Sequence, residues 1–180
     1  LPTNFKSVHM NYFIKIIAAI VFATLSINTY AQTIKTAINS EAANNVKFLN
    51  MESKKYFVHD AEYPEFEAME FTFDNQKTIM KDVDFDGTQD AVSLLYYCEE
   101  TNCHATTKSV DLVVFKGLGK NKFTKLGSAS LGVNAKINNI KNGVISITSY
   151  GYGESDPSCC PTDESKMLYK IKNKKLVKLD

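Results

Sequence analysis

Short segments in which apolar and polar residues alternate recur along the chain after residue 67. Such alternation is typical of β-strands that are buried on one face. We expect strands at residues 68–74, 91–98, 110–115, 122–126, 133–137, 144–148, 167–171 and 176–179, and a further one at residues 55–59. The 91–98 segment is apolar on both faces, which predicts a strand covered on both sides at the centre of the core.

Turn signals between these segments pair them into hairpins. Gly117 and Gly119 follow the 110–115 strand, the Asn142-Gly143 pair follows the 133–137 strand, and a lysine-rich turn over residues 172–175 separates the last two strands. Three hairpins are therefore expected in the second half of the chain.

The segment before these strands has a different pattern. Between residue 32 and about residue 50, Ile38, Ala42, Ala43 and Val46 have the spacing of a short helix. No segment has the pattern of crossover helices between parallel strands. The sequence therefore predicts a mainly β fold, a single antiparallel β-rich domain of successive hairpins with a short N-terminal helix; an α+β fold is the alternative.

The first 31 residues have the pattern of an export leader. Met10 opens a segment with one early cation, Lys15, and then an apolar run over residues 16–25; Ala31 precedes a candidate cleavage site. We expect residues 1–31 to be a leader that includes a signal peptide from Met10 and is removed. The alternative is a retained membrane anchor, for which the apolar run is short.

This leader implies an exported protein. We expect residues 32–180 to form a single β-rich domain, secreted or periplasmic, with no membrane span in the mature chain. No cysteine lies near the cleavage site, so we expect no lipid on the N-terminus.

Charge and composition give little indication of a partner. The chain has 21 basic and 20 acidic residues, and every basic residue is lysine. Near neutrality argues against a nucleic acid as partner, and the absence of arginine removes the side chain best suited to bidentate phosphate recognition. The partner stays unknown, with a cell-envelope component or a protein as candidates.

One nine-residue segment, Asp-Val-Asp-Phe-Asp-Gly-Thr-Gln-Asp at residues 82–90, has the spacing of a cation-binding loop. Carboxylates at alternate positions, a glycine at the sixth position and a backbone carbonyl at the seventh are what calcium requires of a short loop. The expected ligands are Asp82, Asp84, Asp86, the carbonyl oxygen of Thr88, and Asp90.

An EF-hand is excluded, because its twelfth position would be Ser93 and a strand pattern follows. The segment instead resembles the calcium loops of the FG-GAP and VCBS repeat families, whose pattern Asp-x-Asp-x-Asp-Gly-x-x-Asp it meets. Those families use many copies of the loop to build propellers, whereas this chain has one copy. The resemblance therefore implies a local calcium-binding loop and not the propeller fold. A solvated acidic turn is the alternative.

Given a metal, we expect calcium in a structural role. All the expected ligands are oxygen donors, and calcium accepts irregular, high coordination more readily than magnesium. An ordered loop would hold the chain in place where it enters the 91–98 strand.

The chain contains four cysteines, which should be oxidised in an exported protein. Cys98 and Cys103 bracket a short loop, and Cys159 and Cys160 are adjacent, so three pairings exist. Spacing alone narrowly favours cross-pairing, because a bridge between adjacent cysteines distorts the intervening peptide bond. A zinc site that uses Cys98, Cys103, His104 and one of the later pair is the alternative.

A second resemblance lies at residues 156–162, Asp-Pro-Ser-Cys-Cys-Pro-Thr, followed by the 167–171 strand and a lysine-rich turn. This run resembles the C-terminal signature of a group of uncharacterised bacterial envelope proteins akin to LppP/LprE-type lipoproteins, although the chain has no lipobox cysteine. Members often lack counterparts of Cys98 and Cys103, which implies a bridge between Cys159 and Cys160 and a separate one between Cys98 and Cys103. The pairing stays open, and the group brings no known activity.

Catalytic motifs are not evident, so we assign no catalytic residue and regard an enzyme as the less favoured class. The chain has no Gly-x-Ser-x-Gly elbow, His-Glu-x-x-His pair or phosphate-cradling glycine loop. His59 and His104 are more simply read as surface or hydrogen-bonded residues. Glu99, Glu100 and Glu154 would supply a carboxylate pair only if the fold brought them together.

A candidate ligand surface remains at Tyr150, Tyr152, His104 and Glu154, although the two tyrosines could instead pack over the disulfide region. The sequence thus predicts an exported module of unknown activity that calcium stabilises and that serves in binding or in the envelope. A small secreted hydrolase and an inhibitor with a disulfide-pinned loop are the alternatives.

Overall fold

A computed structural model of the chain describes residues 32–58, 68–100, 103–104, 108–157 and 159–179. The chain from Gln32 to Asp180 forms one compact unit. The expected leader over residues 1–31 and the residue His59 lie outside the described residues, so the signal peptide stays a prediction.

Within the described residues, eight strands form two antiparallel sheets and one helix packs on the first of them. The sheet orders are β1-β2-β3-β4 and β5-β6-β7-β8, so within each sheet strands adjacent in sequence pair with each other. The elements are α2 (Ile34–Val58), β1 (Phe71–Lys81), β2 (Asp90–Glu99), β3 (Lys108–Gly117), β4 (Phe123–Ser130), β5 (Asn134–Lys141), β6 (Val144–Gly151), β7 (Asp163–Lys172) and β8 (Lys175–Leu179). The prediction of a mainly β, antiparallel fold with an N-terminal helix is confirmed.

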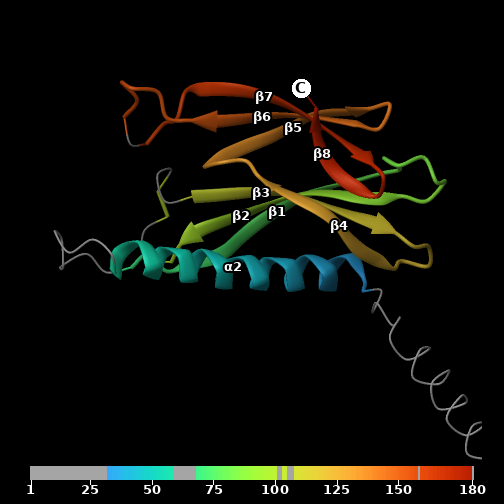
Figure 1. Cartoon of the computed structure of the whole chain (residues 1–180), viewed down its shortest axis with the longest axis horizontal. Helices are drawn as coiled ribbons and strands as arrows, with labels where there is room; N and C mark the ends of the chain where they lie inside the picture. The colour runs from blue at the N-terminus through green and yellow to red at the C-terminus, as the bar shows by residue number, and fades with distance from the viewer. Residues whose placement is uncertain (1–31, 59–67, 101–102, 105–107, 158, 180) are drawn as a thin grey trace, which may run out of the picture. The chain divides into compact units, whose positions relative to one another are not determined.

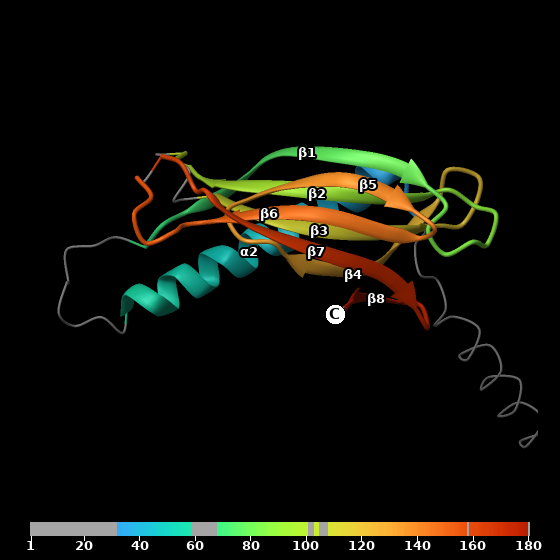
Figure 2. The same cartoon turned by 90° about the horizontal axis from the view of Figure 1, so that it is seen from above.

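The elements form three layers (Figure 1). Helix α2 covers one face of the first sheet, and the second sheet covers the opposite face. The strands of the two sheets run along roughly the same axis (Figure 2). The first sheet is therefore the middle layer, and its central strands β2 and β3 are shielded from water on both faces.

Two cores lie on the two faces of this middle layer. The helix-side core consists of Ala37, Ile38, Ala42, Ala91, Leu95, Tyr97, Val113, Phe115 and Phe123. The core between the sheets consists of Val83, Val92, Leu94, Val110, Leu112, Val114, Leu131, Ala135, Ile145, Ile147 and Tyr169. Neighbouring residues of β2 and β3 belong to different cores, as the pleat of a strand requires. The prediction that the 91–98 strand is covered on both sides is confirmed.

Helix α2 is longer than expected, and the strand predicted at residues 55–59 is wrong where the structure describes it. The helix continues through Val58. Elongating a helix adds a hydrogen bond for each residue, whereas a strand needs a neighbour to pair with. Two further contacts support this end of the helix. The ammonium nitrogen of Lys55 lies 3.9 Å from a carboxylate oxygen of Glu52, one turn earlier. The side-chain amide of Asn50 donates to the carbonyl oxygen of Phe71 and accepts from its N–H group.

Strand β1 also differs from its predicted range of 68–74. It begins at Phe71 and continues to Lys81, although the side chains from Asp74 onward are exposed. The alternation of apolar residues ends at Asp74, so the pattern gave no signal for the rest. Backbone pairing with β2 extends the strand, with an irregularity after Phe73.

The three predicted hairpins are confirmed as β3–β4, β5–β6 and β7–β8. In the second, Lys141 pairs with Val144, which leaves Asn142 and Gly143 as a two-residue turn. Both turn residues have positive φ, 52° and 71°, as the favoured hairpin turns require. An Asn-Gly pair adopts this conformation at little cost, so the local sequence specifies this connection.

A carboxyl group lies between α2 and the first sheet, on the helix-facing side of β3. Asp111 accepts a hydrogen bond from the side-chain amide of Asn45. Burial raises the pKa of Asp111 to about 6, and nearby Glu41 adds to the rise, while Asn45, Ser130 and Lys125 oppose it. Because Lys125 also pairs with Glu41, Asp111 has no cation of its own among the described residues.

Replacing Asp111 with Asn should stabilise the protein at neutral pH. A carboxyl group with a raised pKa binds its proton more tightly when folded, so its ionisation reduces the free energy of unfolding as pH rises from 3.8 to about 6. We expect Asp111→Asn to be more stable by about 1–2 kcal/mol near pH 7.5 and to lose this advantage near pH 4. Urea unfolding at both pH values measures the difference. The exposed Asp163→Asn is the control, and an advantage independent of pH would contradict the assignment.

Candidate metal centre

The acidic loop connects the end of β1 to the start of β2 at one end of the first sheet. Its carboxylates accept hydrogen bonds from its own backbone. Asp82 accepts from the N–H groups of Phe85 and Gly87 at 2.8 and 3.0 Å, Asp84 accepts from that of Asp86 at 3.3 Å, and Asp86 accepts from that of Thr88 at 2.8 Å. Phe85 and Gly87 have positive φ, which lets the chain turn around the carboxylates.

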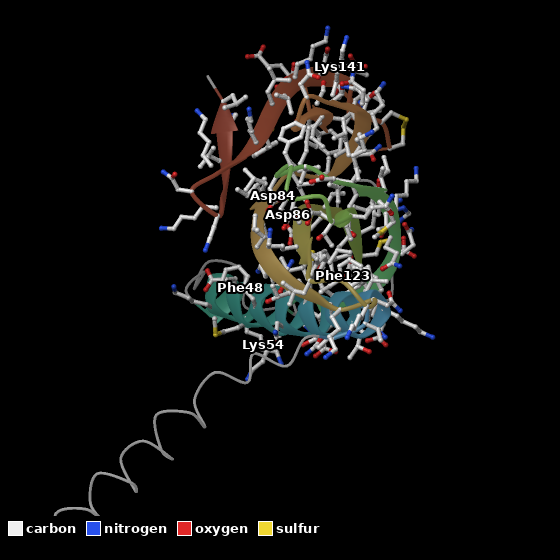
Figure 3. All side chains as sticks on the ribbon, turned by 90° about the vertical axis from the view of Figure 1, so that its right-hand side faces the viewer. Phe48, Lys54, Asp84, Asp86, Phe123 and Lys141 are labelled. Carbon is white, nitrogen blue, oxygen red and sulfur yellow. A yellow bond between two sulfur atoms is a disulfide. The ribbon has the colours of Figure 1, made fainter. Side chains whose placement is uncertain are left out.

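This wrapping brings three carboxylates together. One oxygen from each of Asp82, Asp84 and Asp86 lies within 4.8 Å of the others, close enough to hold a metal ion. Asp84 and Asp86 lie side by side at this end of the sheet (Figure 3). The cluster thus offers only oxygen donors from a single short segment.

Lys116, at the end of β3, donates hydrogen bonds to both Asp84 and Asp86. These bonds raise the pKa of Lys116 and lower the pKa of Asp86. Lys116 was not predicted from the sequence, because it lies some 30 residues away along the chain and only the antiparallel pairing of β2 with β3 brings it to the loop. Two of the three clustered carboxylates thus share the ammonium group of Lys116.

Asp90 was expected to be a ligand, but its carboxylate lies outside this cluster. It is 1% exposed, and its two oxygens accept hydrogen bonds from the backbone N–H groups of Val83 and Gly117 at 3.0 and 2.9 Å. Burial raises its pKa, although both hydrogen bonds favour the ionised form. Asp90 therefore fastens the loop to β3. Thr88, the fifth expected ligand, lies in the loop and is half-buried.

Two glycines allow the loop to approach its neighbours closely. A Cβ atom on Gly117 would lie 2.1 Å from the carbonyl oxygen of Gln89. A Cβ atom on Gly143, in the β5–β6 turn, would lie 2.8 Å from both the ring of Phe85 and the carbonyl oxygen of Val83. Val83 itself belongs to the core between the sheets. The loop is thus packed against hairpins of both sheets.

The four cysteines form two local disulfides, Cys98–Cys103 and Cys159–Cys160. The cross-pairing that spacing narrowly favoured is therefore wrong. The chain turns back after β2 and places the Cα atoms of Cys98 and Cys103 5.3 Å apart, an ordinary disulfide separation. With every cysteine oxidised, no thiolate remains for the alternative zinc site.

The other candidate residues lie at the opposite end of the sheets. Tyr150 lies near the end of β6, with the ammonium of Lys136 5.3 Å from its ring centre. Tyr152 and Glu154 follow in the β6–β7 loop, where Glu154 is exposed, and His104 is exposed beside Cys103. None of these four residues is among the described residues that line a cavity beside β1 or another beside α2.

Comparisons of this chain with protein-family models, with curated proteins and with solved structures find no significant match. The resemblances to the FG-GAP and VCBS loops and to the envelope group therefore stay predictions. Among the described residues, no helix has the length and apolar character needed to cross a membrane.

Replacing Asp90 with Asn should destabilise the protein whether or not calcium is present. An amide keeps one acceptor oxygen but turns an NH₂ group toward the N–H of Val83 or of Gly117, which leaves a buried donor without a partner. We expect a loss of about 1–3 kcal/mol in the free energy of unfolding, measured in EDTA by urea titration. The exposed Asp74→Asn is the matched control. Equal stability of the two variants would show that the Asp90 carboxylate does not fasten the loop to β3.

Proposed function

We propose that this chain is an exported binding or envelope module whose 82–90 loop holds a structural calcium ion. The observation that carries the proposal is the cluster of Asp82, Asp84 and Asp86, whose oxygens lie within 4.8 Å of one another on a loop that its own backbone donors wrap. Three carboxylates at this distance repel one another, and Lys116 neutralises only part of their charge. A divalent cation would neutralise the remainder.

Calcium suits this site better than magnesium. The donors are carboxylates and backbone carbonyls of a short loop, and calcium accepts six to eight oxygens in irregular geometry, whereas magnesium requires a near-ideal octahedron. In the proposed complex the ammonium of Lys116 gives up its contact with Asp84 or Asp86. Lys116 thus competes with calcium and limits its affinity.

The proposed role is structural because the loop is anchored in the packed interior at two residues, Val83 and Asp90. Val83 lies in the core between the sheets and Asp90 is fastened to β3. Calcium would hold the connection between β1 and β2 and thereby the entry to the central strand. Two disulfides support the proposal of export, since such bonds persist mainly in oxidising compartments.

The alternatives of a hydrolase and an inhibitor lack a comparable observation. A hydrolase would be favoured by a cleft that gathers His104, Glu99, Glu100 or Glu154, and neither described cavity is lined by these residues. We therefore keep the calcium-stabilised module as the proposal.

Calcium should raise the melting temperature of the purified protein by a few degrees, because a ligand that binds only the folded state stabilises it by mass action. Asp84→Ala should remove most of this increment, since the cluster loses one of its three carboxylates. Differential scanning calorimetry in calcium and in EDTA measures both effects. Asp163→Ala, far from the loop in sequence and exposed, should keep the full increment. An unchanged melting temperature in calcium would refute the metal site.

Replacing Lys116 with Gln should tighten calcium binding, because it removes the competing ammonium from Asp84 and Asp86. We expect an affinity several-fold higher, about 1 kcal/mol of binding free energy, by isothermal titration calorimetry. Lys120→Gln, at an exposed lysine in the following turn, is the control for the loss of one positive charge. Weaker calcium binding by Lys116→Gln would mean that Lys116 supports the site rather than competes for it.

A further inference from the structure

A cavity lies at the end of the sheets away from the acidic loop. It has a volume of about 340 Å³ and lies where the first part of β1 and the last part of β2 meet the start of β5 and the β6–β7 loop. The acidic loop joins the opposite ends of β1 and β2 (Figure 1). The volume falls at the lower end of the range for small-molecule sites. None of the described residues that line the cavity belongs to the proposed calcium site.

The lining of this cavity carries positive charge. Lys77 from β1 and Lys108 from β3 both line it, together with one carboxylate, that of Asp74. Within the described part of the chain neither lysine forms an ion pair, and Asp74 accepts a hydrogen bond from its neighbour Asn75. Two lysines without carboxylate partners at one concave site favour an anionic ligand.

The remaining lining combines an aromatic ring with amide groups. The ring of Tyr96 lies beneath the ammonium of Lys77, 5.9 Å from its centre. The Tyr96 hydroxyl donates to the carbonyl oxygen of Ala135 at 3.0 Å, which fixes the ring between the two sheets. Asn75 and Asn134 add side-chain amides, which both donate and accept hydrogen bonds. Such a lining suits a ligand that has hydroxyl groups and a ring face as well as a negative charge.

The β6–β7 loop forms the far wall of the cavity and is fixed before any ligand binds. Cys159 and Pro161 line the cavity. The carboxylate of Asp156 accepts hydrogen bonds from the N–H of Gly153 at 2.8 Å and from the N–H and hydroxyl of Thr162 at 2.7 and 2.6 Å, which closes the loop. The Cys159–Cys160 bridge constrains the loop further. A preformed wall lowers the entropy lost on binding.

We propose that this cavity binds a sugar that carries a carboxylate, such as a glycuronic acid residue. The carboxylate would pair with Lys77 and Lys108, and the hydroxyl groups would bond to the amides of Asn75 and Asn134. A face of the pyranose ring would lie against the apolar lining residues Tyr96, Val133 and Pro161. The proposal adds a ligand class to the module and does not depend on calcium.

Two matched glycosides test the proposal. Methyl β-D-glucuronide and methyl β-D-glucoside differ only in the carboxylate at C6, and each is titrated into the ¹⁵N-labelled protein and followed by NMR. We expect saturable shifts of amides around the cavity with the glucuronide and at least ~10-fold weaker binding of the glucoside. Lys77→Gln/Lys108→Gln should lower the glucuronide affinity by at least ~10-fold. The control Lys120→Gln/Lys141→Gln, with one exposed lysine in the β3–β4 turn and one at the end of β5, should bind as the wild type does.

Each contrary result would overturn the proposal. The proposal is wrong if the glucuronide causes no saturable shifts or if the two glycosides bind equally. It is also wrong if Lys77→Gln/Lys108→Gln binds the glucuronide as tightly as the wild type does. Inorganic phosphate that reproduces the same shifts with equal affinity would show a site for anions in general and not for a sugar acid. Single Lys108→Gln, at an exposed residue, keeps the test decisive if the double variant does not fold.

Discussion

Burial of β2 and β3 on both faces is the constraint on which the rest of the structure depends. A helix covers one face and a sheet covers the other, so both faces of these strands need apolar side chains, and a shift of one residue would exchange the two cores. A polar group here needs an internal partner, as buried Ser93 has in the hydroxyl of Thr78. In β2 and β3 the charged residues accordingly lie near the strand ends, with the exception of Asp111, whose pKa burial raises.

The two ends of these strands carry different candidate sites and are held by different contacts. At one end, Asp90 ties the acidic loop to β3 through two backbone hydrogen bonds, and Lys116 offsets part of the charge of the carboxylate cluster. At the other end, two disulfides and the Asp156 carboxylate hold the loops beside a cavity lined by two lysines. The molecule thus places a carboxylate cluster at one end of these strands and a cavity lined by two lysines at the other.

Most of the strands could be predicted from the sequence. A strand that faces water on one side alternates apolar and polar residues, and a strand that faces apolar cores on both sides is a continuous apolar run. The prediction failed where backbone pairing or helix elongation outweighed the pattern of apolar and polar residues. Residues 55–58 end in three residues of types common in strands, Tyr-Phe-Val, but continue α2. The exposed part of β1 shows no alternation yet pairs with β2. Spacing alone narrowly favoured the wrong disulfide pairing, because the spacing of Cys98 and Cys103 does not show that the chain brings their Cα atoms to 5.3 Å.

For the candidate site, the sequence by itself determined the loop and its carboxylates, because the spacing of aspartates around Gly87 is a local property that turns the chain upon itself. Only the tertiary structure decided what each carboxylate does. Asp90 turns inward to two backbone N–H groups, and Lys116 reaches the cluster from a strand that is distant in sequence. These roles depend on the register between β2 and β3, which is set by packing over the whole sheet and not by any residue of the loop.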